Sequence, residues 1–252
     1  MSHPYTLVDH DGTLLAWADA WPGILCGAAN REVLEVALPK AAADYRSWLN
    51  RHGIEGPAAG PWTVSNEVPS AGGLTGGDPI YLSDRQTLSA SEFERFLEHV
   101  RAAQADLRDT ANMPDVLLDW IPPAVTVQRI DPWAPDPRSA RGILVHALQL
   151  EVFYREGLRD GPAAGIFERV RTAEVEHSAT VEILRAAALS DPDQVYRPQR
   201  IQRPNAAPEP AGEWTIRKVI RRLISHDRQH AAEITERRIS SQSGGSGRAP
   251  ST

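Results

Sequence analysis

Two histidines four residues apart are the side chains of this sequence best placed to do chemistry. His226 and His230 fall on the apolar stripe of residues 212–237, where hydrophobic side chains recur every three or four positions; this period predicts one long amphipathic helix. Imidazoles at this spacing lie one turn apart on the same face, so the helix can offer two nitrogens to one metal ion. The alternative is a pair of hydrogen-bonded histidines in a core or groove, which the spacing alone does not exclude.

A third histidine, His146, lies between Ile143 and Leu150 on the apolar stripe of an earlier predicted helix. Three inward imidazoles from two facing helices supply three metal ligands and leave coordination positions open for water or a substrate. That arrangement is typical of a catalytic or substrate-binding metal rather than of a closed structural site. Zinc, nickel and ferrous iron all accept imidazole nitrogens, so the ligand type does not select among these metals.

Three further polar residues are candidates for supporting roles. His177 lies on the inner stripe of another predicted helix; it is a further ligand, an acid or base beside a substrate, or a core histidine paired with Glu174 one turn before it. Glu151 and Asp227 either accept an N–H from a ligand imidazole and orient it, or are ordinary exposed carboxylates. The remaining histidines are expected to be solvated: His3, His10, His52 and His99. The arginines of residues 212–237 either grip an anionic substrate or form a solvated basic face.

Four amphipathic segments in the second half of the chain predict the four-helix bundle that would position these side chains. The first begins at a capping serine, Ser89 or Ser91, and the second at Ser139. The third covers residues 166–184, and the fourth is the 212–237 segment, where Thr215 can cap the start.

The first part of the chain predicts a smaller α/β module. Residues 5–18 form a hairpin around an Asp-Gly turn, and short runs at 24–26, 62–68 and 79–82 can add strands. Asn30 and Gly53 mark the two ends of a helix, and Pro39 predicts a kink or a split inside it. A boundary near residues 82–91 divides the chain into units 1–85 and 86–239, which a disordered tail, 240–252, follows.

Composition limits the classes of function. The 252 residues are 41% hydrophobic and 24% charged, as expected for a soluble globular protein of one or two domains. A net charge of -6, with no helix-turn-helix or zinc-finger pattern, argues against a nucleic-acid partner. Cys26 is the single cysteine and fits a reducing cytoplasm. The sequence has no apolar run or signal-peptide pattern that would indicate a membrane partner.

The first part of the chain resembles the HicB-like fold. That family runs from a hairpin through a phrase like elPGc-x-x-G to a helix that ends near yl-x-x-l-x-x-x-G. Residues 21–27 read WPGILCG, and residues 41–53 match the helix phrase. The resemblance implies a small α+β module with a three- or four-stranded sheet, often an antitoxin or a ligand-sensing unit.

The second part, residues 89–238, resembles the DinB-like superfamily. The second helix of that family carries H-l-x-x-x-E-x-x-y, and residues 146–154 read HALQLEVFY. Its fourth helix carries W-(S/T)-(I/V)-R-x-(I/V)-l and then H-(E/D)-x-x-H-x-x-x-I, and this chain reads WTIRKVI at 214–220 and HDRQHAAEI at 226–234. The resemblance implies an all-α bundle of up-down-down-up topology behind the α+β module. It also implies a divalent metal ion, zinc or nickel, with ligands His146, His226 and His230.

Three functions follow from these observations. The first is a metal-dependent transferase or hydrolase, in which the ion lowers the pKa of a thiol or water and generates the nucleophile; the resemblance favours transfer of a low-molecular-weight thiol, such as mycothiol or bacillithiol, to a small electrophilic substrate. The second is a non-catalytic regulatory protein whose HicB-like module recognises a ligand or partner. The third is a bundle with vestigial histidines that serves assembly. Homodimerisation is compatible with each of the three.

Overall fold

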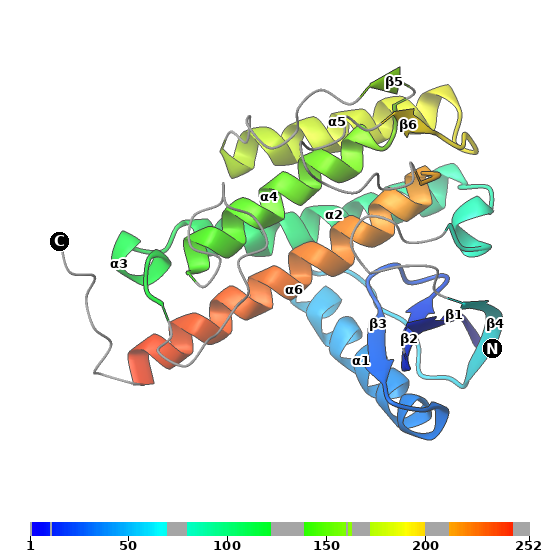
Figure 1. Cartoon of the computed structure of the whole chain (residues 1–252), viewed down its shortest axis with the longest axis horizontal. Helices are drawn as coiled ribbons and strands as arrows, with labels where there is room; N and C mark the ends of the chain where they lie inside the picture. The colour runs from blue at the N-terminus through cyan, green and yellow to red at the C-terminus, as the bar shows by residue number, and fades with distance from the viewer. Residues whose placement is uncertain are drawn as a thin grey trace.

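The computed structural model describes residues 2–10, 12–69, 80–121, 139–159, 161–162, 172–199 and 212–243. A β-sheet with one covering helix is followed by a bundle of four long helices (Figure 1). The predicted fold class, an α+β module followed by an all-α bundle, is therefore confirmed. Within the described ranges, no helix has the length and hydropathy needed to cross a bilayer.

The N-terminal sheet has four strands in the order β3-β2-β1-β4. The strands are β1 (His3–His10), β2 (Thr13–Ala18), β3 (Leu25–Ala28) and β4 (Trp62–Pro69). Neighbours pair antiparallel except β4, which runs parallel to β1. Gly12 has a φ of 83° in the tight turn between β1 and β2, a conformation that glycine adopts without a steric cost. The predicted hairpin and the strand at 62–68 are confirmed.

Residues 80–82, which the sequence analysis offered as a strand, are not part of the sheet. They lead into a short 3-10 helix, η1 (Ser83–Arg85). The carboxylate of Asp84 accepts the backbone N–H of Tyr81 at 3.0 Å, so it folds the segment back on itself instead of leaving that N–H for a neighbouring strand. Residue 79 lies outside the described residues.

Helix α1 (Arg31–Arg51) covers the sheet and begins and ends where the sequence predicts. The side chain of Asn30 accepts the N–H of Val33 at 2.9 Å, and Gly53 has a φ of 72° just past the end. The helix runs unbroken through Pro39, so the predicted split does not occur. Its inward face is buried over the whole length, and this burial outweighs the loss of one backbone hydrogen bond.

The bundle consists of four long helices and one short one. They are α2 (Ala90–Ala111), α3 (Asp115–Leu118), α4 (Ala140–Glu156), α5 (Ala173–Ser190) and α6 (Ile216–Ser243). Ser89 caps α2 in a capping box with Glu92, and Ser139 caps α4, as predicted. Two-residue strands β5 (Gly161–Pro162) and β6 (Pro198–Gln199) pair outside the bundle. Helix α6 extends beyond residue 240, where the tail was expected to begin, and residues 244–252 of that tail are not described.

One hydrophobic core joins the N-terminal module to the bundle. Buried side chains of the sheet and of α1 belong to the same cluster as those of α2, α5 and α6. Tyr45 and Leu49 of α1, Phe96 of α2 and Ile220 of α6 are each at most 1% exposed. A division of the chain at residue 85 stays a prediction, and the apolar packing crosses that position without interruption.

The basic residues at the start of α6 are buried, so the expectation of a solvated basic face is wrong. Arg217, Lys218 and Arg221 are 8%, 0% and 4% exposed. The Arg221 guanidinium donates two hydrogen bonds to the Asp84 carboxylate, at 2.8 and 3.1 Å, and lies 4.0 Å from the Tyr81 ring centroid. Helix α6 contacts α2, α4, α5 and η1, so little of its circumference at this end is left for water.

Candidate metal centre

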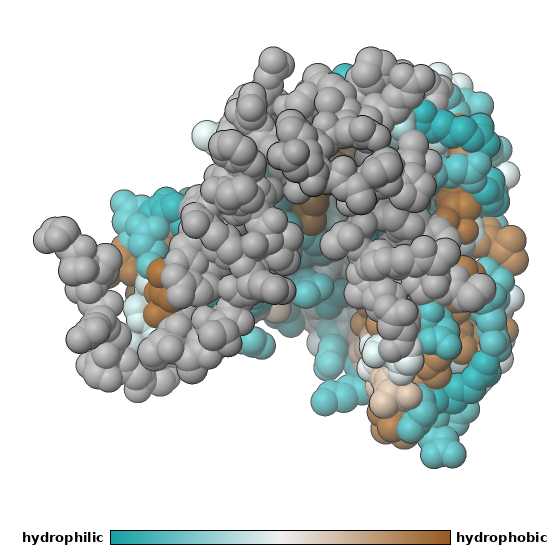
Figure 2. Space-filling model, in the orientation of Figure 1, coloured by the Kyte–Doolittle hydropathy of each residue, from teal (hydrophilic) through white to brown (hydrophobic). Residues whose placement is uncertain are grey.

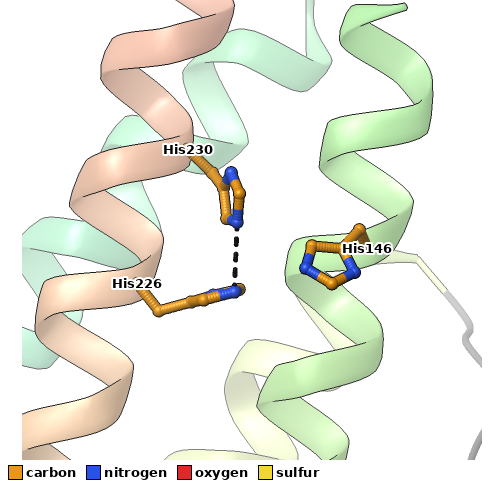
Figure 3. Close-up of side chains that lie close together, drawn as sticks. All are labelled: His146, His226 and His230. Atoms are coloured by element: carbon orange, nitrogen blue, oxygen red, sulfur yellow. Dashed lines mark hydrogen bonds between the residues drawn. The ribbon is translucent and has the colours of Figure 1, made fainter. Parts of the chain in front are cut away.

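Three histidine rings converge between α4 and α6. His146 projects from α4 towards His226 and His230 of α6 (Figure 3). One ring nitrogen of each residue lies within 4.8 Å of those of the other two, and the Nε2 atoms of His226 and His230 are 3.1 Å apart. The ring of His146 lies 5.5 Å from that of His226 and 5.3 Å from that of His230, between centroids. The convergence expected from the sequence is observed.

The backbone explains this convergence. Residues four apart in α6 lie on the same face, and that face is turned towards α4, which packs against α6. Ala147 and Ala231, one residue beyond His146 and His230, are almost completely buried in a small cluster with Ile143. Small side chains at these positions let the two helices approach closely enough for the rings to meet.

His226 is in the protonation state that metal binding requires. The side chains of His226 and His230 are only 12% and 13% exposed. Burial, and after it the neighbouring charges of His230, His146 and Arg222, lowers the pKa of His226 well below its ordinary value. The imidazole of His226 is therefore neutral at pH 7, and the neutral form carries the lone pair that binds a metal ion.

The spacing of the nitrogens fits a divalent ion. Two nitrogens bound to one tetrahedral zinc ion, each at about 2.0–2.1 Å, are about 3.4 Å apart. The 3.1 Å between the Nε2 atoms of His226 and His230 is close to this value, and the His146 ring faces both from the opposite helix (Figure 3). The donor set is three imidazoles, which zinc and nickel both accept.

A carboxylate that the sequence analysis missed orients one of the rings. Nδ1 of His230 lies 3.2 Å from Oε2 of Glu233; a carboxylate only accepts, so Nδ1 is the donor. The lone pair of Nε2 therefore points to the other histidines, and here it accepts a hydrogen bond from Nε2 of His226, 3.1 Å away (Figure 3). Arg237 donates to the other oxygen of Glu233 at 2.8 Å. The hydrogen bond from His230, and after it the charge of Arg237, lowers the pKa of Glu233. The signal was present in the sequence, since residues three and four apart on a helix are neighbours.

Asp227 lies beside the site but forms no hydrogen bond there. Its side chain is buried, and Oδ1 is 3.5 Å from Nδ1 of His226. Both carboxylate oxygens and this Nδ1 are buried without a hydrogen-bond partner. Burial, and after it the charge of Glu151, raises the pKa of Asp227 well above its ordinary value. A shift of a few tenths of an ångström would let Asp227 orient the ring, so that role stays a prediction.

Glu151 and His177 form a separate buried pair. Nδ1 of His177 lies 2.7 Å from Oε2 of Glu151, and Nε2 of Gln104 donates to Oε1 at 2.6 Å. His177 therefore pairs with Glu151 and not with Glu174, which corrects the sequence-based expectation. The carboxylate of Glu151 is buried rather than exposed. Although Glu151 is close to His146 in the sequence, its hydrogen bonds go to His177 and Gln104 and not to the three converging rings. Catalytic roles for either residue stay predictions.

One histidine expected to be solvated is fully buried. His99 is 0% exposed, its Nδ1 lies 2.9 Å from the Tyr45 hydroxyl, and its ring stacks on Trp21. Burial is the main reason why the pKa of His99 is lowered to about 4. His99 belongs to the contact between α1 and α2 rather than to the metal centre.

Comparison with known proteins adds no assignment. No family model matches the chain, and neither the curated proteins nor the solved structures contain a match. What the chain can do must therefore be inferred from its own residues.

Proposed function

We propose that this protein is a metal-dependent enzyme of the DinB-like type. His146, His226 and His230 would hold a divalent ion, zinc or nickel. The observation that carries the proposal is the approach of three ring nitrogens to within 4.8 Å of one another between two helices. Three protein ligands leave a coordination position open, which distinguishes catalytic sites from closed structural ones.

The chemistry expected is the activation of a nucleophile. The bound ion would lower the pKa of a coordinated thiol or water. Glu233 would hold His230 in the tautomer that binds metal, through the contact at 3.2 Å. Arg222 donates to the Tyr154 hydroxyl at 3.2 Å, and the Tyr154 ring centroid is 5.7 Å from that of His226. This guanidinium puts positive charge near the site and favours an anionic group such as a thiolate.

The substrate is the part of the proposal that rests on resemblance. A thiol of low molecular weight would be transferred to a small electrophilic molecule; with water in its place, the enzyme would be a hydrolase. The alternatives are a regulatory protein whose HicB-like module recognises a ligand, and a scaffold whose histidines are vestigial.

A thiol-consumption assay tests the proposal. Protein loaded with zinc or nickel is mixed with a thiol and a chromogenic aryl halide, and the loss of free thiol is followed. We expect the loaded protein to accelerate the transfer and His226→Ala to abolish the acceleration, while the matched control His3→Gln retains it. Metal binding without transfer, together with hydrolysis of an activated ester, would make the protein a hydrolase. If the metal-loaded protein showed no thiol transfer and no ester hydrolysis, the enzyme proposal would be contradicted and the regulatory alternative would be favoured.

A further inference from the structure

A cleft lies beside α6 on the side of Arg228, which points away from the three histidines. Its volume is about 580 Å³, within the range of roughly 300–1,000 Å³ that small-molecule sites occupy. Arg228, which lines it, is two residues from both His226 and His230, and so lies about 200° around the helix axis from each. In Figure 2, hydrophilic and hydrophobic side chains lie next to one another in the lower right part of the molecule, where Figure 1 places α1. None of the three converging histidines lines the cleft.

Three helices build this cleft, and both signs of charge line it. Helix α1 contributes Asp44 and Arg51, α2 contributes Asp106 and Asp109, and α6 contributes Arg228 and Arg238. Three arginines and three aspartates give the lining a balance of formal charge. Trp48, Met113, Ala231 and Ala232 add apolar surface between these charged groups.

Two of these charged side chains, Asp106 and Arg228, form contacts that hold α1, α2 and α6 together. Asp106 accepts the indole N–H of Trp48 at 2.7 Å and lies 3.1 Å from Nε2 of His52. The Arg228 guanidinium donates to the carbonyl of Gly23 at 2.7 Å and lies over the Trp48 ring at 4.4 Å from its centroid. These contacts fix the apolar wall formed by Trp48.

The other four charged side chains of the cleft do not form such contacts with the residues that the structure describes. Asp44, Arg51, Asp109 and Arg238 are exposed, and none of them forms a hydrogen bond or ion pair through its side chain with any part of the chain that the structure describes. Two acids and two bases at the rim of one cleft would ordinarily be expected to pair with each other. Asp44 and Arg51 influence the Arg228 guanidinium through their charges, but each of the four side chains can still receive a charged group of the opposite sign.

We propose that the cleft binds a small zwitterion, a molecule that carries one carboxylate and one ammonium group, of the size of a dipeptide. Arginine forks bind the carboxylate in a bidentate manner, and an aspartate accepts hydrogen bonds from the ammonium. The face of Trp48, with Met113, packs against the apolar part of the ligand. A purely anionic or purely cationic ligand would meet like charge as well as opposite charge in this lining.

Calorimetric titration of the whole protein tests this inference with a panel of free dipeptides that includes alanyl-leucine. Each is compared with its N-acetylated form, which lacks the ammonium group, and its C-amidated form, which lacks the carboxylate. We expect saturable binding of a free dipeptide and at least about tenfold weaker binding of both capped forms, equivalent to about 1.4 kcal/mol. Arg238→Gln and Asp109→Asn should each weaken binding, whereas Arg101→Gln and Glu98→Gln, at exposed positions of α2 outside the cleft, should not.

Two outcomes would overturn the inference. One is the absence of binding by every free dipeptide at concentrations up to about 10 mM; the other is equal binding of a capped form, which would make the cleft a site for a single charge. The titration is repeated with His226→Ala. Because the cleft does not use the histidines, binding should persist in that variant, and failure of the metal-dependent activity would leave this result unchanged.

Discussion

Removal of the Asp84 carboxylate should cost more stability than removal of any exposed acid. The side chains of Asp84 and Arg221 are 3% and 4% exposed, and the two hydrogen bonds between them, at 2.8 and 3.1 Å, tie η1 to α6. In Asp84→Asn the shape is kept but the Arg221 charge stays buried without its counter-charge. Loss of one partner of a buried ion pair destabilises a protein by roughly 3–5 kcal/mol, and we expect a loss in that range.

Urea unfolding, followed by tryptophan fluorescence and by circular dichroism, measures this loss. The matched control is Asp119→Asn, which breaks the exposed pair with Arg141, whose side chains are 55% and 37% exposed. Exposed pairs contribute at most about 1 kcal/mol, so the control should unfold almost like the parent protein. If Asp84→Asn also lost less than about 1 kcal/mol, the Arg221 guanidinium would have to be solvated, and the account of a buried basic face on α6 would be refuted.

Three other predictions concern separate parts of the molecule. Acid should destabilise the protein through His99, because the unfolded chain takes up a proton near pH 6.5 whereas the folded pKa is about 4. The free energy of unfolding should therefore fall by roughly 3 kcal/mol as the pH drops across this interval, and urea unfolding of His99→Gln should lack this component; an identical pH profile would contradict the assignment. Glu233→Gln should weaken zinc binding about 10–100-fold in competition with a chromogenic chelator, and the exposed neighbour variant Glu236→Gln should not; equal affinities would leave Glu233 without an orienting role. Gly23→Ala should lower the thermal midpoint by an equivalent of about 1–3 kcal/mol, since its Cβ would overlap the Tyr45 ring, and an unchanged midpoint in calorimetry would show that the ring can move aside.

Features decided by neighbouring residues could be predicted from the sequence. Asn30, Ser89 and Ser139 each cap the helix that they precede, because the bond from the cap to an N–H three residues later is entirely local. The period of the apolar residues likewise gave the inward faces of α4 and α6, and with them the three histidines that converge between these helices. These signals need no knowledge of which elements become neighbours.

Features decided by distant partners could not be predicted in the same way. Asp84 and Arg221 are 137 residues apart, so neither the turn at η1 nor the burial of the basic residues is visible in local periodicity. His177 finds Glu151 on another helix, 26 residues away, in place of the nearby Glu174. An apolar stripe predicts which face of a helix is buried, but it does not predict which polar side chain of a neighbouring helix will contact that face.

The metal content of the purified protein tests the central claim most directly. The protein is stripped with chelator, reloaded with zinc or nickel, desalted and analysed by mass spectrometry for metal per chain. We expect one ion per chain in the parent protein, none in His226→Ala or His230→Ala, and full occupancy in the control His3→Gln. Full occupancy in both α6 variants, or none in the parent protein, would contradict a metal centre between α4 and α6.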